Sequence, residues 1–351
     1  MIGSLAQFTT RLLNWYDAHR RDLPWRVSED RPGPLDPYHV LLSETMLQQT
    51  QVATVIPYFR RFIERLPTLA DLAAAPEQEV LRLWEGLGYY SRARNLRSAA
   101  QKIVADLGGR IPSKVIDLQE LPGIGRYTAG AVASIAFGEP APVLDGNVMR
   151  VLCRIDGIEN DPREKQTHEK LWQRAQDLVP AARPGDFNSA LMELGATVCR
   201  PRNPQCLLCP VRRHCRAAAD DTQDRIPPAR ETRPTPLYRR YIYCIRRRGR
   251  WLLEQRPETG RWAGMWQFVT IETPDPNLLP VQVREPRPVG RFSHQLTHRR
   301  YQFHVFIADA ISAQTRDTGR TRKWVRVCDL DRYPLPRPHI LALQSVLKGG
   351  V

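Results

Sequence analysis

The sequence predicts an all-α region over its first two thirds, followed by a smaller α+β domain. The chain has 351 residues, more than one core usually serves, so two domains are expected. Apolar residues recur at helical spacing up to Cys199 and alternate with polar ones in short runs after Leu237. Between them, residues 217–236 combine charge with prolines and lack an apolar period, which predicts an exposed linker. The predicted domains are therefore residues 1–216 and 237–351.

The predicted helices of the first domain follow from apolar residues spaced three and four apart. The first has Ser4 as its candidate N-cap. In order, the predicted helices are Ser4–His19, Tyr38–Gln48, Gln51–Arg65, Glu77–Trp84, Ala93–Leu107, Val115–Leu121, Thr128–Phe137, Val148–Cys153, His168–Leu178 and Phe187–Cys199. In the second domain, strands are predicted on either side of a turn at Gly249, in residues 265–272 and in residues 300–310.

The net charge of +15 and the pI near 9.9 favour a polyanionic partner, most simply nucleic acid. Residues 237–351 carry +12 of this charge. Charge that serves solubility alone is the other interpretation. No apolar run approaches the ~18 residues of a membrane helix, and the first residues do not resemble a signal peptide. We therefore expect a cytoplasmic protein without a membrane partner.

Two glycines, Gly123 and Gly125, interrupt helical patterns in the segment LPGIGRYTAGAVASIAFG. Pro122 stops the first helix, and the glycines have no Cβ, so the backbone can approach another molecule closely. Backbone N–H groups at such a turn, beside a helix N-terminus, can bind a phosphate oxygen. An ordinary connection between two helices is the other interpretation.

A lone carboxylate, Asp145, follows in the segment PVLDGNVMR. The order of helix, glycine turn, helix and aspartate resembles the helix-hairpin-helix superfamily of DNA glycosylases. The resemblance implies a hairpin at about residues 113–137 within two α-helical subdomains that also carry an iron–sulfur loop. A carboxylate near the sugar stabilises the oxocarbenium character that develops as an N-glycosidic bond breaks. Asp145 is also a candidate cap for the helix that follows it.

Glu44 is the candidate general acid for such a reaction. An adenine anion is a poor leaving group unless a ring nitrogen is protonated, which requires a carboxylic acid with a raised pKa in a dry pocket. In YHVLLSETMLQQTQV, apolar residues surround Glu44 on several sides, which favours partial burial over a solvated helix face; they are Val40, Leu41, Leu42, Met46 and Leu47.

Four segments, SETMLQQTQV, RRDLPWR, WEGLGYYSRARNL and FNSALMELGATVC, resemble the MutY-type adenine DNA glycosylases. The resemblance covers most of residues 20–216. It implies that Glu44 protonates adenine, that Asp145 stabilises the sugar cation, and that Tyr127 and Asn147 help to place water and the carboxylates. It also implies an adenine pocket formed by Trp25, Arg26, Leu47 and Ser189. The residues that it implies for contacts with DNA are Gln49, Thr50, Tyr89, Gly123 and Gly125.

The resemblance has further implications at Gln49, Tyr89 and Ser189. Gln49 and Tyr89 match the family's positions that fill the gap left by a flipped base, although a tyrosine packed against a helix is the other interpretation of Tyr89. Ser189 stands where the family often has Glu or Gln, which leaves open how the adenine edge is read.

Tyr127 separates two related activities. In the endonuclease III family, the matching position is a lysine that forms a Schiff base with the sugar and cuts the strand. A phenol cannot form a Schiff base. We therefore expect release of the base and an abasic site, with little or no strand cleavage.

Four cysteines, Cys199, Cys206, Cys209 and Cys215, lie in CRPRNPQCLLCPVRRHC at spacing C-x6-C-x2-C-x5-C. Four thiolates this close suit zinc or an iron–sulfur cluster, and chemistry alone does not choose between them. The spacing resembles the [4Fe-4S] loop of the endonuclease III and MutY families, which implies that cofactor. Unligated core cysteines are the alternative that such a polar loop disfavours.

The segment WLLEQRPETGRWAGMWQFV resembles the start of the Nudix-like domain found at the end of MutY-type proteins. The glutamate-rich metal helix of a Nudix hydrolase is missing between Trp266 and Tyr301, which predicts a recognition module. The segment GRFSHQLTHRRYQFHVF resembles the family's Phe-Ser-His turn, which implies that Phe292, Ser293 and His294 sense 8-oxoguanine. The alternatives are a plain hairpin turn and a metal bound by His294, His298 and His304, which their spacing disfavours.

The leading hypothesis is therefore a base-excision-repair glycosylase that removes adenine opposite 8-oxoguanine or guanine in duplex DNA, acting as a monomer. The first alternative is an endonuclease III-like glycosylase and lyase for oxidised pyrimidines. The second is a non-catalytic iron–sulfur protein that binds DNA, which would not require Glu44 and Asp145 together.

Overall fold

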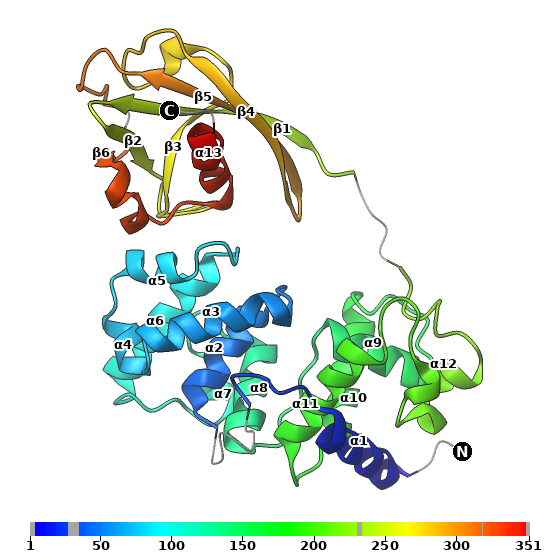
Figure 1. Cartoon of the computed structure of the whole chain (residues 1–351). Coiled ribbons are helices and arrows are strands. Elements are labelled where there is room, and N and C mark those ends of the chain that lie inside the picture. Colours follow the sequence, from blue (N-terminus) through cyan, green and yellow to red (C-terminus); the bar gives the residue numbers. More distant parts are fainter. Residues whose placement is uncertain (1–3, 27–34, 230–233, 318, 349–351) are drawn as a thin grey trace. The chain divides into compact units, whose positions relative to one another are not determined.

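The computed structural model describes residues 4–26, 35–229, 234–317 and 319–348. The chain divides into two compact units, which are described separately here (Figure 1). The first contains residues 1–73 and 98–231, and the second contains residues 74–97 and 232–351. None of the helices in the described residues has both the length and the apolar character needed to cross a membrane.

The first unit is entirely helical, which confirms the predicted fold class. Its helices are α1 (Leu5–His19), α2 (Pro37–Leu47), α3 (Val52–Arg65), α4 (Leu69–Ala74), α7 (Val115–Gln119), α8 (Arg126–Phe137), α9 (Gly146–Asp156), α10 (Lys165–Leu178), α11 (Pro184–Thr197) and α12 (Arg216–Ala219). Helix α5 (Glu77–Leu83) belongs to the second unit, and α6 (Ser91–Asp106) begins there. Each of the ten predicted helices is present with shifted ends, whereas the short α4 and α12 were not predicted.

Helix α2 lies at the centre of the helical region. The Asp36 carboxylate accepts the N–H of Tyr38 at 2.8 Å, and Pro37 occupies the first helical position, so the start of the helix is well specified. Eight of the eleven residues are buried, and the helix packs against α3 and α8. A helix that is buried nearly all round also buries any polar residue it carries, which fixes the environment of Glu44.

A second core joins α1, α9, α10 and α11. Leu12, Leu152, Leu171 and Phe187 are among its fully buried side chains. Helix α11 passes so close to the start of α9 that a Cβ on Gly195 would lie 2.6 Å from the Cβ of Asn147. Only glycine permits this approach, which brings α11 against the residues that follow Asp145.

Part of the predicted linker is packed rather than exposed. Ala217 and Ile226 are buried in the core of the helical unit, and Arg154 Nε donates to the Ile226 carbonyl at 2.8 Å. The prediction of an exposed linker from residue 217 is therefore wrong for this part, because single buried residues leave no apolar period in a sequence. Residues 230–233 of the predicted linker lie outside the described residues.

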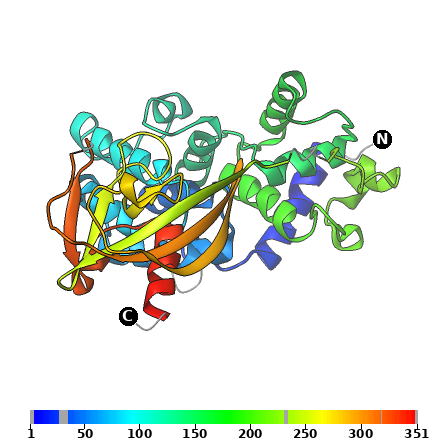
Figure 2. The ribbon, with the colours of Figure 1, turned by 90° about the horizontal axis from the view of Figure 1, so that it is seen from above.

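The second unit is built on a mixed sheet of six strands (Figures 1 and 2), which confirms the α+β prediction. The strands are β1 (Leu237–Arg247), β2 (Arg250–Gln255), β3 (Trp266–Ile271), β4 (Arg287–Leu296), β5 (Arg299–Asp309) and β6 (Arg322–Arg326), in the order β4-β5-β1-β3-β2-β6. β1 and β5 are parallel, and the other pairs are antiparallel. Helix α13 (Arg337–Lys348) packs on β1, β4 and β5. β4, β6 and α13 were not predicted.

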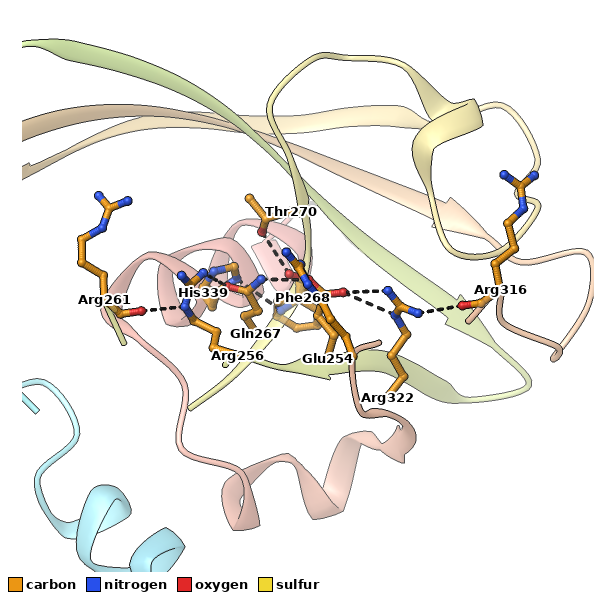
Figure 3. A network of polar contacts seen from close by, with 10 residues as sticks. Glu254, Arg256, Arg261, Gln267, Phe268, Thr270, Arg316, Arg322 and His339 are labelled. Atoms are coloured by element: carbon orange, nitrogen blue, oxygen red, sulfur yellow. Dashed lines mark hydrogen bonds and ion pairs between the residues drawn. The ribbon is translucent and has the colours of Figure 1, made fainter. Parts of the chain in front are cut away.

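A buried polar network ties β2, β3 and β6 together (Figure 3). Glu254, only 2% exposed, accepts hydrogen bonds from Arg320 Nη1 at 2.6 Å, Gln267 Nε2 at 2.9 Å and Arg322 Nη2 at 3.2 Å. Arg256 Nη1 donates to Gln267 Oε1 at 2.9 Å, and Arg256 Nε donates to the Arg261 carbonyl at 2.7 Å. The network thus extends from the sheet to the loop between β2 and β3.

Replacing Glu254 by glutamine is expected to destabilise the C-terminal domain. The side chain of Arg322 is 7% exposed and would lose its ion pair with Glu254 in the interior, and breaking a buried ion pair typically costs about 3–5 kcal/mol. Urea unfolding measures the loss. Asp329→Asn is the matched control, because its partners Arg326 and Arg332 are mostly exposed and such pairs contribute about 1 kcal/mol or less. Equal stability of the two variants would contradict the prediction.

Candidate active site

A cavity of about 1230 Å³ lies within the helical unit. It is formed by α2, the turn that follows α2, the hairpin turn before α8, the start of α9 and one face of α11. Twelve of the residues predicted from the sequence line it, namely Trp25, Arg26, Glu44, Leu47, Gln49, Thr50, Gly123, Gly125, Tyr127, Asp145, Asn147 and Ser189. The fold therefore brings together residues that are up to 164 positions apart in the chain.

Glu44 is a buried carboxyl group on α2, with 5% of its surface exposed. The alternative of a solvated helix face is therefore wrong. Burial raises the pKa of Glu44 to about 7, and the nearby charge of Asp145 adds to the rise, whereas a hydrogen bond from Tyr127 and the charge of Arg26 oppose it. Near neutral pH, this group can both hold and release a proton.

Tyr127 orients Glu44. Its hydroxyl group donates to Glu44 Oε2 at 2.6 Å, and the sulfur of Met192 on α11 lies 3.3 Å from the Tyr127 hydroxyl oxygen. Burial, together with the charges of Glu44 and Asp145, holds the pKa of Tyr127 well above its usual range. Because the phenol stays protonated, it donates to Oε2, and a proton on Glu44 resides on Oε1.

Asp145 is fixed at the N-cap of α9. Its Oδ1 accepts the N–H of Val148 at 2.7 Å, and its Oδ2 accepts from Asn147 Nδ2 at 2.9 Å. Arg150 holds the amide of Asn147, because its Nη2 donates to Asn147 Oδ1 at 3.0 Å and to the Gly195 carbonyl at 2.7 Å. The capping role of Asp145 is thus observed, and it leaves the carboxylate facing the cavity.

The surroundings of the two carboxyl groups differ. Burial raises the pKa of Asp145, but the hydrogen bonds from Val148 and Asn147 oppose the rise, and the N-terminus of a helix favours negative charge. Within the described residues, Glu44 receives one hydrogen bond, from Tyr127. Asp145 is therefore the group that carries the charge, and Glu44 is the group that keeps the proton.

Glu193 and Arg21 were not predicted as site residues, yet both line the cavity. Glu193 accepts from Arg21 Nε at 2.5 Å and from Arg26 Nη2 at 3.0 Å. Burial alone would raise the pKa of Glu193, but Arg21 and Arg26 outweigh it and the pKa lies below its usual range. The sequence offered one signal: Glu193 lies four residues after Ser189, on the same face of α11. Ser189 itself is buried.

The hairpin turn has the geometry of an anion site. Gly123 has φ 74°, a left-handed conformation that favours glycine. Gly125 is the N-cap of α8 without a side-chain hydrogen bond to the first turn, and a Cβ there would meet open space. The first N–H groups of α8 can therefore bind an external oxygen. On the facing turn, Gln49 has φ 56°, an uncommon backbone state that is often found at binding sites.

The remaining residues that were predicted to contact DNA belong to the second unit. Tyr89 is 45% exposed, and its hydroxyl group lies 2.5 Å from Thr297 Oγ1. Phe292, Ser293 and His294 were expected at a turn, but they lie within β4, because the β4–β5 pairing continues to Leu296 and Arg299. Phe292 and His294 face the core, and Ser293 is exposed on the opposite face.

The four cysteines lie on one loop beside α9, and each is half-buried. Arg154 contacts two of them: its Nη1 donates to Cys199 Sγ at 3.3 Å, and its carbonyl accepts from Cys215 Sγ at 3.3 Å. Arg150 Nε donates to the Cys199 carbonyl at 2.8 Å. In the described residues, no three His, Cys, Asp or Glu side chains form a group that could hold a metal ion. His294, His298 and His304 therefore do not form a metal site in the structure either.

Known proteins resemble both parts of the chain. Residues 42–177 match the family model of the HhH-GPD superfamily base excision DNA repair protein, and residues 240–345 match that of the NUDIX domain. The adenine DNA glycosylase of Homo sapiens is 39% identical over 367 residues, covering 87% of this chain and 67% of that protein. The adenine DNA glycosylase of Buchnera aphidicola subsp. Acyrthosiphon pisum (strain APS) is 32% identical over 351 residues, covering 97% and 98%.

Solved structures agree with the fold of the helical unit. A thermostable thymine-DNA glycosylase is 32% identical and covers 62% of this chain and 97% of its own, with a TM-score of 0.54. A trapped endonuclease III–DNA covalent intermediate has a TM-score of 0.52 at 24% identity, covering 62% of this chain and 99% of its own, which shows a shared fold. The cavity with its two carboxyl groups and the similarity along nearly the whole chain lead to one conclusion: the chain belongs to the adenine DNA glycosylase family.

Proposed function

We propose that this adenine DNA glycosylase acts on adenine opposite 8-oxoguanine or guanine in duplex DNA, and leaves an abasic site without cutting the strand. The observation that carries the proposal is one cavity lined both by Glu44, whose pKa burial raises to about 7, and by Asp145, whose carboxylate is held at the N-cap of α9. Breaking the bond between adenine and the sugar requires a proton for the base and a negative charge for the sugar, and the two groups supply them.

In the proposed mechanism, the adenine leaves the stack and enters the cavity. Glu44 transfers the proton on Oε1 to a ring nitrogen, which turns adenine into a neutral leaving group. Asp145 stabilises the oxocarbenium ion that remains, held in place by Val148 and Asn147. A water molecule then adds to the sugar carbon, and its proton returns to a carboxylate. The hairpin N–H groups at Gly125 bind the strand through a phosphate.

The absence of lyase activity follows from the side chains near the sugar. Strand cleavage through a Schiff base needs an amine that attacks the sugar. Tyr127 occupies the expected position, and the cavity residues that the structure describes include no lysine. Their cations are guanidinium groups, which remain protonated and are poor nucleophiles.

Two further roles belong to this proposal. The chemistry of Cys199, Cys206, Cys209 and Cys215 fits a [4Fe-4S] cluster, since four half-buried thiols share one loop and three of them pack against the helical core. The structure does not gather these thiols into a metal-binding group, so the proposal rests on their chemistry and their shared loop. When bound, the cluster would fix the loop, whose arginines favour phosphate. The domain of residues 237–351 would recognise 8-oxoguanine, with Phe292, Ser293 and His294 as the residues of the motif.

The test is single-turnover cleavage of a duplex with one adenine opposite 8-oxoguanine, or opposite guanine, assayed with and without alkali. We expect strand breaks only after alkali treatment, because adenine release leaves an alkali-labile abasic site. Breaks before alkali treatment would refute the monofunctional mechanism. No abasic product from protein loaded with its cluster would refute the proposed substrate.

The excision rate is expected to fall as pH rises through about 7, because the active form has Glu44 protonated and its pKa is about 7. The rate should drop about tenfold per pH unit above that point. Tyr127→Phe removes a hydrogen bond that lowers the pKa of Glu44, so its rate profile should shift to higher pH. Single-turnover rates between pH 5 and 9 measure both profiles, and a shift to lower pH would contradict the role given to Tyr127.

A further inference from the structure

Three arginines surround two stacked tyrosines in the C-terminal domain. Tyr238 on β1 pairs with Tyr301 on β5, and their ring centroids are 5.6 Å apart. The guanidinium carbon of Arg261 lies 4.8 Å from the Tyr301 centroid, that of Arg299 lies 5.1 Å from the Tyr238 centroid, and that of Arg240 lies within 6 Å of both. We call these five residues the arginine–tyrosine cluster.

The cluster holds an excess of positive charge. Burial lowers the pKa of Arg261, and the charges of Arg299 and Arg240 lower it further, so the three cations repel one another. Among the described residues, one ion pair involves the cluster, between Arg240 and Glu272 at 2.7 Å, and the side chain of Glu272 is 77% exposed. An anion at this place would relieve the repulsion.

Two buried donors in the cluster have no acceptor among the described residues. Tyr301 is 2% exposed, and its hydroxyl group makes no hydrogen bond within the described residues. The same holds for Arg261 Nη1, whose guanidinium group lies over the Tyr301 ring. Leaving a buried donor unpaired costs about 1–3 kcal/mol, so native proteins rarely do so without a reason. Both groups can donate a hydrogen bond, and an anion with several oxygens would supply the acceptors that they lack.

The backbone that carries Arg261 is held in place. Its carbonyl accepts from Arg256 Nε at 2.7 Å, and Arg256 is fixed by the Glu254 network. Figure 3 shows the Arg261 side chain extending away from that network. The next residue, Trp262, has φ 51°, an uncommon state for an aromatic residue and one that is often found at ligand sites. The guanidinium group is thus presented by a loop fixed in advance.

We propose that the arginine–tyrosine cluster binds one backbone phosphate of duplex DNA. A phosphate offers several oxygens, which suits convergent guanidinium groups and a hydroxyl donor. The site adjoins the motif on β4, because the ring of Trp262 lies 6.2 Å from that of His294 and beside Arg261. The proposal rests on the proposed function, since the partner is DNA. A free nucleotide offers the same chemistry, and the experiment separates the two sources.

The first test is the salt dependence of DNA binding by the full-length protein with Arg261→Gln and Arg299→Gln combined. Each phosphate contact contributes about 0.9 to the slope of log K against log[salt], so the slope should fall by about 1. Affinity near 0.1 M salt should fall about tenfold, equally for duplexes with guanine and with 8-oxoguanine, because a phosphate contact carries no base information. The control is Arg248→Gln, at the β1–β2 turn, which should keep the wild-type slope.

The second test is Tyr301→Phe. A neutral hydroxyl group displaces no counterion, so we expect a severalfold loss of affinity at an unchanged salt slope. Because this hydroxyl group has no acceptor in the part of the chain that the structure describes, its removal should not lower the melting temperature. A lower melting temperature with unchanged DNA affinity would show a structural role for the hydroxyl and overturn the proposal.

The outcomes separate this site from the proposed function. A wild-type salt slope in the double variant would overturn the phosphate site, whether or not adenine is excised. Stabilisation of the wild-type protein by dGTP that the double variant loses, with an unchanged DNA slope, would overturn DNA as the source of the phosphate. A reduced slope on a duplex without adenine mispairs would support the site even if the excision assay failed.

Discussion

Glutamine in place of Glu44 is expected to lower the single-turnover rate of adenine excision by about 10²–10⁴-fold, the usual contribution of a general acid. The amide has the size of the protonated acid and can accept the Tyr127 hydrogen bond, so the fold of α2 should be unchanged. It cannot transfer a proton to the base. The measurement is alkali-revealed cleavage at pH 6, where the wild-type Glu44 is mostly protonated because its pKa is about 7.

A binding measurement and a control variant separate a loss of the chemical step from a loss of DNA binding or of folding. The variant should still bind a duplex with adenine opposite 8-oxoguanine, since only the chemical step is impaired. Glu169→Gln, on the exposed face of α10, is the control and should keep the wild-type rate. A Glu44→Gln protein with a rate within tenfold of the wild type and the same pH dependence would exclude Glu44 as the acid.

Asparagine in place of Asp145 should lower the excision rate by about 10²–10³-fold, the loss expected when a group that stabilises transition-state charge is removed. Asparagine caps a helix about as well as aspartate does, so α9 keeps its N-cap and loses only the negative charge. The substitution therefore separates the two roles of Asp145. Single-turnover rates and thermal melting, measured on the same preparation, report on them.

Asp145→Ala completes the comparison. It should excise no faster than Asp145→Asn and should also lose about 1 kcal/mol of stability, because the hydrogen bond to the Val148 N–H is lost. If Asp145→Asn kept the wild-type rate while Asp145→Ala did not, Asp145 would be a capping residue alone, and the sugar cation would need another partner.

The sequence predicted features that depend on local patterns. Helix α9 could be predicted because its candidate cap, Asp145, and its apolar spacing lie within a short segment. Glu44 stood out because its helix is apolar on several sides, and the structure buries it. The gathering of the cavity residues was predicted through the resemblance to a family, since spacing alone does not place α2 beside α8.

The features that the sequence did not predict correctly also have physical reasons. Glu193 is held by Arg21, which is 172 residues away in the chain, and no local pattern reports such a pair. The motif on β4 was expected at a turn because its segment resembles the family's Phe-Ser-His turn, whereas strand pairing with β5 extends through it. Ala217 and Ile226 were placed in a linker because isolated buried residues have no period.

Helix α9 has a further consequence for the protein. Asp145 caps its first turn, and Arg150 and Arg154 on its later turns contact the loop of the four cysteines. At about 1.5 Å per residue, the helix is a rigid spacer of about 16 Å. Its position is therefore anchored at both ends. Loosening the cysteine loop would let this spacer tilt, and the active-site carboxylate would move although none of its own contacts had been altered.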